Sequence, residues 1–303
     1  MPAPETRPVF RHPQGRRGVL ERLVTEPVAR VLHRLARRHL AQGRPPMVIF
    51  AFDHIGHHIN LEGLYERSEL EAFMAWITAA GVNLRDGVVL DIGANIGNHS
   101  LFFAPHCARV VAYEPNPRTF QVLCLNAQLA PNIECRKKAL SDRAGRARLS
   151  LDPENVGSAS LGTAVGGIDA GGTLVDLVAL DDEPDLGPVR VVKMDIEGHE
   201  WKALQGASTL LARHQPIVLF EQHPRDFVDG RSPVIELLRS QGYRRFATVA
   251  RQPRVNVAGA LGRWVLTPLA RLLVGESVTV HLRERIEPGF YYFLVALPDW
   301  VGD

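Results

Sequence analysis

The chain has 303 residues, of which 46% are hydrophobic and 22% are charged, and its net charge is +2. A chain of this length and composition can bury the core of one large α/β domain with smaller appendages. The near-zero net charge speaks against dedicated nucleic-acid binding, which needs an excess of cations on one surface.

The cysteines and the apolar runs indicate the compartment. The three cysteines form no CxxC pair and no even disulfide framework, which favours a reducing environment. No apolar segment typical of a secretion signal follows the first basic residues. No uncharged apolar run reaches the roughly 18 residues that a membrane span needs. We therefore expect a cytoplasmic protein.

Residues 1–46 are expected to form a basic helical extension, since they contain ten Arg and three Glu. The stretch GVLERLVTEPVARVLHRLARRHL predicts an amphipathic helix that Pro27 kinks or splits. Its apolar side comprises Leu20, Leu23, Val24, Val28, Val31, Leu32 and Leu35. In one interpretation the helix caps the core and turns a basic face to solvent. In the other it makes peripheral contact with an anionic membrane or an acidic partner.

Residues 47–86 are expected to lead into the core as a hairpin and a helix. Gly43 to Pro46 act as a linker, and MVIFAFDHIGHHINLEGLYE then predicts two strands around a turn. The histidines of DHIGHH fall in that turn, where solvated side chains are a simpler interpretation than a metal site. A helix over 68–80 follows, with Ser68 as N-cap, Glu71 completing a capping box and Gly81 ending it.

Residues 87–303 are expected to form the main domain. Continuous apolar runs, separated in several places by helical patterns, indicate strands buried on both faces of a parallel sheet; these runs are GVVLDI, ARVVAYE, NIECRKKAL, VRVVKMDI and QPIVLFE. YRRFATV and FYYFLVAL add two strands near the end. The prediction is a doubly wound, mostly parallel, seven-stranded Rossmann-like α/β fold. We expect a hairpin insertion over 146–180 and a helical cap over 255–276.

A glycine loop follows the first buried strand in the pattern Asp91-x-Gly93-x-Asn95-x-Gly97. Ligands bind at this edge of an open parallel sheet, and glycines allow the backbone to approach them closely. Glu114 ends the next strand, where a carboxylate can accept hydrogen bonds from both hydroxyls of a ribose. The spacing departs from the G-x-G-x-x-G of pyrophosphate binders. A loop with Asp91 and Asn95 suits a sulfonium cation and an amino-acid tail better than a phosphate.

Two polar residues, Ser141 and Asp142, follow the third predicted strand. In the expected strand order they would edge an adenine ring and bond its exocyclic amine. A polar turn without contact to a ligand is the alternative.

A second polar cluster, VVKMDIEGHEW, ends the fourth predicted strand and contains Asp195, Glu197, His199 and Glu200. Several carboxylates at one strand end are costly to bury unless cations or hydrogen bonds compensate. Glu200 has an alternative role at the start of the next helix, where the helix dipole favours an acid.

The fifth strand contributes Glu221 and His223, which a strand places on one face. Histidine titrates near neutral pH and is a natural base for a hydroxyl. The predicted catalytic residues are therefore His223 and Asp195, followed by His199. Asp195, Glu221 and His223 could also bind a metal, but their spacing is not diagnostic of one, and we predict no metal site.

Taken together, VVLDIGANIGNHSL, AYEPNP, ALSD, VVKMDIEGHEWKALQGA and PIVLFEQHP resemble the FkbM-type methyltransferases. The resemblance implies a class I methyltransferase domain, S-adenosylmethionine as cofactor and O-methylation of a sugar, glycolipid, polyketide or other small molecule. It implies that Asp91, Gly93, Asn95, Gly97 and Glu114 bind the cofactor. Asp195, Glu197 and Glu200 match the second family motif, which does not name the base.

Two other classes of function stay open. One is an NAD(P)-dependent oxidoreductase on a related sheet, against which the missing phosphate glycine speaks. The other is a noncatalytic protein that binds an adenosyl ligand, which acids at two strand ends make less attractive. The motifs specify neither the acceptor nor the oligomeric state.

Overall fold

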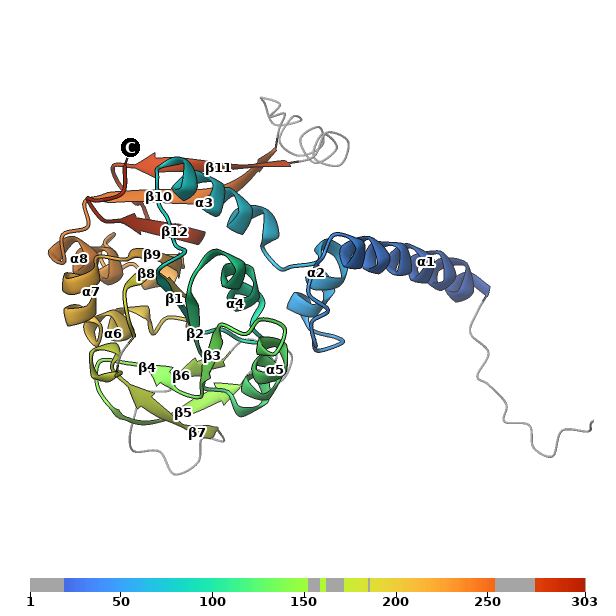
Figure 1. The fold of residues 1–303 in the computed structure, drawn as a ribbon, viewed down its shortest axis with the longest axis horizontal. Helices are drawn as coiled ribbons and strands as arrows, with labels where there is room; N and C mark the ends of the chain where they lie inside the picture. The colour runs from blue at the N-terminus through green and yellow to red at the C-terminus, as the bar shows by residue number, and fades with distance from the viewer. Residues whose placement is uncertain (1–18, 152–158, 162–171, 185, 254–275, 303) are drawn as a thin grey trace, which may run out of the picture.

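The computed structural model describes residues 19–151, 159–161, 172–184, 186–253 and 276–302 (Figure 1). The predicted helical cap over 255–276 lies outside these residues except for Glu276, which begins a strand.

The core is a sheet of eight strands, and five neighbouring ones run parallel. In spatial order the strands are β11 (Glu276–Arg283), β10 (Arg245–Pro253), β12 (Tyr291–Leu297), β9 (Ile217–Gln222), β8 (Val189–Met194), β1 (Val88–Ile92), β2 (Arg109–Tyr113) and β3 (Ile133–Arg136). β12, β10 and β11 pair antiparallel. The mostly parallel sheet is confirmed, and the predicted number of seven strands is wrong by the edge strand β11.

Helices cover both faces of the sheet because successive side chains of each strand point to opposite sides. Val89 and Leu219 pack toward α3 (Arg67–Ala79) and α4 (Asn98–Phe103). Leu90 and Phe220 pack in a separate cluster with α6 (Glu200–Gln205), α7 (Ser208–His214) and α8 (Pro233–Ser240). α5 (Pro117–Ala127) lies against β3. Short 3₁₀ helices η1 (Ala104–His106), η2 (Leu180–Asp182) and η3 (Pro224–Asp226) follow strands or helices. The doubly wound architecture is confirmed.

A second, smaller sheet has the order β4 (Ala139–Leu140), β7 (Thr173–Val178), β5 (Gly145–Leu151) and β6 (Ala159–Leu161). β5 and β7 pair antiparallel, so the predicted hairpin insertion is confirmed for the described residues. The run NIECRKKAL is not one strand, because its first half forms β3 of the main sheet and its end forms β4 of the second. The chain therefore leaves the main sheet before it reaches Ser141.

The segment predicted as a hairpin forms a helix, α2 (His54–Glu62), so that prediction is wrong. Ile55 and Ile59 are four residues apart and lie on one face of this helix, and Gly63 ends it with a φ of 84°. The alternation in MVIFAF belongs to an extended linker before the helix. In α3 the N-cap position is held by Glu66 rather than Ser68, so the predicted capping box is wrong as well.

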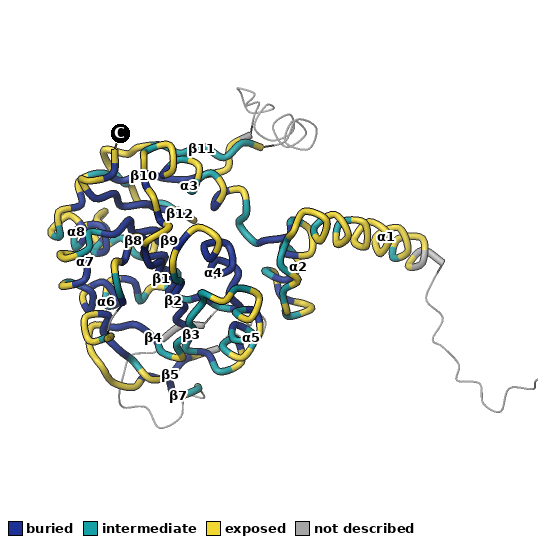
Figure 2. Tube along the Cα trace, viewed as in Figure 1, coloured by how far each residue is buried: buried dark blue, intermediate teal, exposed yellow. Residues whose placement is uncertain are grey.

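The N-terminal helix α1 (Val19–Ala41) is continuous through Pro27 and is directed away from the body of the molecule (Figure 1). Its large aliphatic side chains are exposed along almost the whole described length (Figure 2). The interpretation in which this helix caps the core is therefore wrong. Among the described helices, none is both long enough and apolar enough to cross a membrane.

One buried side chain ties the linker that follows α1 to the main domain. The amide of Asn126 exchanges two hydrogen bonds with the backbone of Val48, at 2.7 and 2.9 Å. The same amide donates to the carbonyl of Ile96, in the glycine loop, at 2.7 Å. The linker and the loop are therefore held together by α5.

Candidate active site

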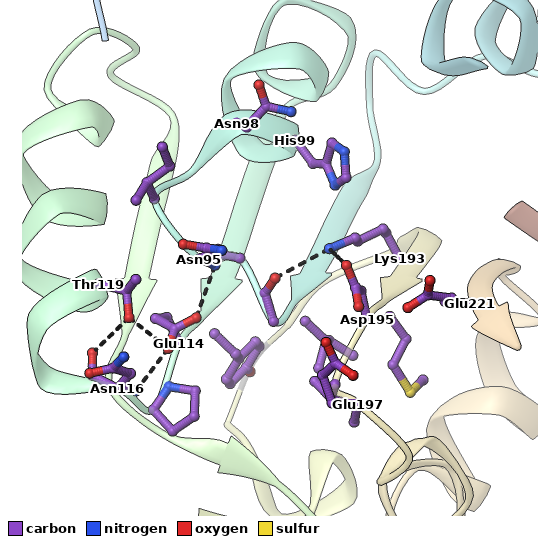
Figure 3. A pocket seen from close by; sticks show the side chains of 18 of the residues that line it. Asn95, Asn98, His99, Glu114, Asn116, Thr119, Lys193, Asp195, Glu197 and Glu221 are labelled. Atoms are coloured by element: carbon purple, nitrogen blue, oxygen red, sulfur yellow. Dashed lines mark hydrogen bonds and ion pairs between the residues drawn. The ribbon is translucent and has the colours of Figure 1, made fainter. Parts of the chain in front are cut away.

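A cavity of about 210 Å³ opens at the carboxyl ends of the parallel strands (Figure 3). Each of the four central strands β1, β2, β8 and β9 contributes the residues at its end. This is the edge at which ligands bind in open parallel sheets. The position agrees with that expected for the two polar motifs.

The glycine loop after β1 is folded tightly against the neighbouring strands. Gly93 has a φ of 73°, and a side chain there would bring its Cβ within 1.9 Å of the carbonyl oxygen of Asp195. The N–H groups of Gly93 and Ala94 both donate to the carbonyl of Tyr113, at 3.0 and 2.9 Å. Gly93 and Asn95 line the cavity, whereas Gly97 precedes α4 and does not. Gly97 therefore shapes the loop.

Asp91 lies beneath this loop and is fully buried. It accepts a hydrogen bond from the Ser100 hydroxyl at 2.5 Å, and its Oδ1 is 3.4 Å from the Lys193 ammonium. Lys193 also donates to the carbonyl of Gly93 at 3.2 Å. Burial lowers the pKa of Lys193, but Asp91 and Asp195 raise it further, so the ammonium stays charged. Asp91 does not line the cavity; contrary to the expected direct contact, it supports the loop through Lys193.

Glu114 lines the cavity from the end of β2 and is held by several donors (Figure 3). Its carboxylate accepts the N–H groups of Asn95 at 2.9 Å and Asn116 at 2.8 Å, and the Thr119 hydroxyl at 3.2 Å. Burial raises its pKa to about 7, and these donors act against that rise. The carboxylate is therefore fixed in orientation and close to losing its proton at neutral pH.

Ser141, Asp142 and His199 lie together and do not line the cavity, and their roles toward the ligand stay predictions. The Ser141 hydroxyl donates to Asp142 at 3.0 Å and lies 3.1 Å from Nε2 of His199. β4 belongs to the second sheet, so the chain reaches the cavity from that sheet and not from the end of a strand of the main one. Lys138 to Leu140 line this part of the cavity instead.

Four carboxyl groups line the wall of the cavity opposite Glu114 (Figure 3): Glu66, Asp195, Glu197 and Glu221. We call this side of the cavity the acidic wall. Burial, followed by the charges of Asp195, Glu197 and Glu66, raises the pKa of Glu221 to about 8. The Asp195 carboxylate lies 3.8 Å from the Lys193 ammonium. This wall therefore brings Glu221, whose pKa is raised, together with three further carboxyl groups.

Glu200 lies apart from that wall, at the first position of α6. It is buried and accepts the N–H of Ile196 at 3.1 Å. This is the helix-start role that the sequence left open as its alternative. Burial raises its pKa to about 7.

His223 does not line the cavity, and its role as the base stays a prediction. Its Nε2 is 3.4 Å from Oε2 of Glu221, and its ring packs on Phe290 with centroids 4.8 Å apart. The expected pairing of Glu221 with His223 on one face of the strand is confirmed. His223 therefore contacts Glu221, a residue of the cavity wall, without lining the cavity itself.

Sequence reasoning missed part of the cavity that comes from α4 and the segment before α3. His99 lines the cavity, and its Nε2 is 3.1 Å from Oε2 of Glu66. Tyr65 is anchored by Asn98, which bonds its backbone N–H and C=O at 2.9 and 3.0 Å. Burial and the charges of Glu66 and Asp195 raise the pKa of Tyr65 above its ordinary value. His99 lies two residues after Gly97, at the start of α4, and no pattern in the sequence distinguishes it from a helix residue that lines no cavity.

Among the described residues, no group of three His, Cys, Asp or Glu side chains is placed to hold a metal ion. In α2, the rings of His54 and His58 pack against each other and against Tyr65. His54 also lines the cavity. The absence of a metal site stays a prediction.

A model of the methyltransferase FkbM domain matches residues 91–245, which is more than half of the chain. The chain therefore belongs to the FkbM methyltransferase family. It is also 34% identical over 130 residues to the hexuronic acid methyltransferase AglP of Haloferax volcanii, a match that covers 42% of this chain and 52% of AglP. The chain thus spans about half the length of that curated relative.

Two solved structures are also similar. An FkbM methyltransferase from Methylobacillus flagellatus KT is 23% identical, with a TM-score of 0.33 over 45% of this chain and 32% of the other. Magnesium protoporphyrin IX methyltransferase (ChlM) from Synechocystis PCC 6803, solved with bound SAM, is 13% identical, with a TM-score of 0.41 over 83% and 87%.

S-adenosylmethionine is the cofactor of this methyltransferase, and the donor set of the cavity fits it. The cofactor carries two ribose hydroxyls that donate hydrogen bonds, and Glu114 offers a fixed carboxylate. It also carries a sulfonium cation, and the cavity has an acidic wall. A pyrophosphate would meet that wall unfavourably, which weighs against the NAD(P) alternative.

Proposed function

We propose that this protein transfers the methyl group of S-adenosylmethionine to a hydroxyl of a saccharide. The carrying observation is the acidic wall, where Asp195 and Glu221 face the cavity opposite Glu114. Support for a saccharide comes from the similarity to a hexuronic acid methyltransferase. A glycolipid or another small molecule with a free hydroxyl would use the same chemistry.

We assign the cofactor to the side of the cavity formed by the glycine loop and β2. Glu114 would accept hydrogen bonds from the ribose hydroxyls, and Gly93 and Asn95 would contact the cofactor through the loop they form. Asp91 and Gly97 would act indirectly, by holding the loop in its conformation. Glu114 also accepts hydrogen bonds from the backbone N–H of Asn116 and the hydroxyl of Thr119, which keep its carboxylate in place.

The acceptor hydroxyl is assigned to the acidic wall, with Asp195 as the base. When bound, the cofactor supplies an electrophilic methyl group on a sulfonium that leaves as a neutral thioether. The acceptor oxygen forms the new O–CH₃ bond, the S–CH₃ bond breaks, and Asp195 receives the hydroxyl proton. Asp195 shares this wall with Glu66, Glu197 and Glu221, so taking up the proton reduces the excess of negative charge on the wall.

The activity is tested by incubating the protein with labelled S-adenosylmethionine and a panel of acceptors. The panel contains a uronic acid, a neutral hexose and an alcohol that is not a sugar, and mass spectrometry locates the methyl group. We expect an O-methylated saccharide. Methylation at nitrogen or carbon alone would contradict the proposal, as would tighter binding of NAD(P)H than of S-adenosylmethionine in calorimetry.

The role of Asp195 is tested by Asp195→Asn, which keeps the shape and removes the base. Turnover is expected to fall roughly 100-fold, the usual contribution of general base catalysis. The cofactor dissociation constant should stay within about threefold. His99→Asn is the matched variant on the same cavity, and a larger loss there would transfer the role of base to the His99–Glu66 pair. A large loss of cofactor affinity in Asp195→Asn would assign Asp195 to cofactor binding instead.

A further inference from the structure

Helix α1 has a position that the methyltransferase site does not explain. Figure 1 shows it beside the body of the molecule and directed away from the sheet. Its main described contacts are with α2, which links it to the rest of the chain. A 23-residue helix with so few tertiary contacts gains little stability from packing. Packing against the domain therefore does not account for the position of α1.

The apolar side chains of α1 form one stripe. Val24, Val28, Val31 and Leu32 follow each other at spacings of four, three and one, which place them on one side of a helix. All four are exposed, with Val24 at 63% and Val31 at 51% (Figure 2). Soluble monomers rarely leave a continuous aliphatic stripe in water, so this stripe is a contact surface.

The flank of the stripe is basic. At 100° per residue, Arg38 lies at the edge of the stripe and Arg34 about 60° from Val31, whereas Arg30 and Arg37 lie on the face opposite the stripe. These four side chains are exposed. Glu26 lies 3.7 Å from Arg30, but both are highly exposed, so this pair compensates little of the charge. The surface thus combines aliphatic groups with uncompensated positive charge.

We propose that α1 binds in the plane of an anionic lipid bilayer, with the valine and leucine stripe in the acyl boundary and the arginines at the headgroups. The aliphatic stripe matches the acyl boundary of a bilayer, and the arginines match its anionic headgroups. An acidic protein groove would satisfy the arginines but would need apolar pockets matched to each aliphatic residue. The inference is independent of the proposed acceptor, because it concerns residues outside the cavity.

The test is co-sedimentation of the full chain with vesicles at low ionic strength. Vesicles of equal parts phosphatidylglycerol and phosphatidylcholine are compared with vesicles of phosphatidylcholine alone. We expect binding to the anionic vesicles at least tenfold tighter than to the neutral ones, and weaker binding in 0.5 M salt, where charges are screened beyond about 4 Å. Equal binding to both vesicles, or none to either, would overturn the proposal.

Two double variants separate insertion from simple attraction of charges. Val24→Glu with Val31→Glu places two acids in the stripe and should weaken binding roughly tenfold or more. Ala29→Glu with Ala36→Glu makes the same change of charge on the flank of the stripe that lies away from the arginines, where both alanines are exposed. This control should weaken binding less, through charge alone. Equal losses in the two double variants would overturn insertion of the stripe.

Neutralising Arg34 and Arg38 to Gln should weaken binding by about fivefold for each charge removed. Light scattering and circular dichroism of each variant show whether it is folded and whether the chain self-associates. A dimer that is lost in Val24→Glu with Val31→Glu, without binding of the wild type to vesicles, would make the stripe an interface between two copies and would overturn the proposal.

Discussion

The two walls of the cavity differ in how their polar groups are compensated. On the cofactor wall, the Glu114 carboxylate accepts three hydrogen bonds from its own chain, and the glycine loop is bonded to β2. On the acidic wall, burial and then the charges of Asp195, Glu197 and Glu66 raise the pKa of Glu221. The first wall is preorganised before any ligand binds. The second holds an excess of charge that a ligand or a proton has to relieve.

This difference assigns each wall its part of the reaction. A preorganised carboxylate discriminates a fixed, invariant ligand, because it pays no reorganisation energy on binding. A wall that contains a carboxyl group of raised pKa, Glu221, suits the transfer of a proton from an acceptor that varies. The predictions below test whether the two walls can be disturbed separately.

The largest expected effect is on the cofactor wall. Glu114→Ala should weaken S-adenosylmethionine binding about 100-fold, or about 3 kcal/mol, because charge-assisted hydrogen bonds to both ribose hydroxyls are lost. Calorimetry measures it, and Glu114→Gln serves as the variant that keeps the shape. Glu134→Ala, on the neighbouring strand and outside the cavity, is the control. Unchanged affinity in both Glu114 variants would remove this residue from the cofactor site.

The tight contact between the glycine loop and the backbone of Asp195 can be broken at Gly93. Gly93→Ala places a methyl group 1.9 Å from the carbonyl of Asp195, in addition to the strain of a positive φ. Gly198→Ala introduces the same strain at a φ of 93° but into open space. In urea denaturation we expect a loss of about 1 kcal/mol for Gly198→Ala and about 3 kcal/mol or more for Gly93→Ala. Equal losses would mean that the loop can move away from β8.

The pH dependence of stability should report the carboxylates. The pKa values of Glu114 and Glu200 are raised by burial to about 7, and that of Glu221 to about 8. The native state therefore binds more protons than the unfolded state between pH 4.5 and 8. The contribution of these groups to the free energy of unfolding is fully present below pH 4.5 and is lost as the pH rises to about 8.

Urea denaturation at pH 5, 6.5 and 8 measures this loss. Glu221→Gln should reduce the slope, most visibly above pH 7, because its amide does not titrate. Glu236→Gln, on the exposed side of α8, should leave the slope as it is in the wild type. An identical slope in all three proteins would exclude Glu221 as the group with the highest raised pKa.

The smallest expected effect is at His223, which lies behind the acidic wall. His223→Ala removes a side chain that contacts Glu221 and Phe290 but not the cavity. Turnover should fall about threefold or less, against the roughly 100-fold expected for a base that touches the substrate. Cofactor affinity should not change. A 100-fold loss of turnover would restore His223 as the base.

The cofactor wall could be predicted from the sequence, because its residues are close in the chain. Gly93, Asn95 and Glu114 lie on one strand–loop–helix–strand unit, where spacing and strand ends determine which residues meet. The acidic wall could be predicted only for Asp195, Glu197 and Glu221. Glu66 and His99 join it through packing of the N-terminal segment on α4, and no local pattern encodes that contact.

The errors have local causes as well. The alternation of MVIFAF favoured a hairpin, but the following residues satisfy the spacing of a helix. The run NIECRKKAL predicts a single strand, and a single strand would place Ser141 and Asp142 at the edge of the adenine. Lys137 and Lys138 of that run lie between β3 and β4, where the chain passes from the main sheet to the second one.

Asn126 has a mechanical consequence. Its side chain joins the backbone of Val48, at the root of the N-terminal arm, to the backbone of Ile96 in the glycine loop. The arm and the loop are therefore coupled at one side chain, and removal of the Asn126 amide would release both anchors at once.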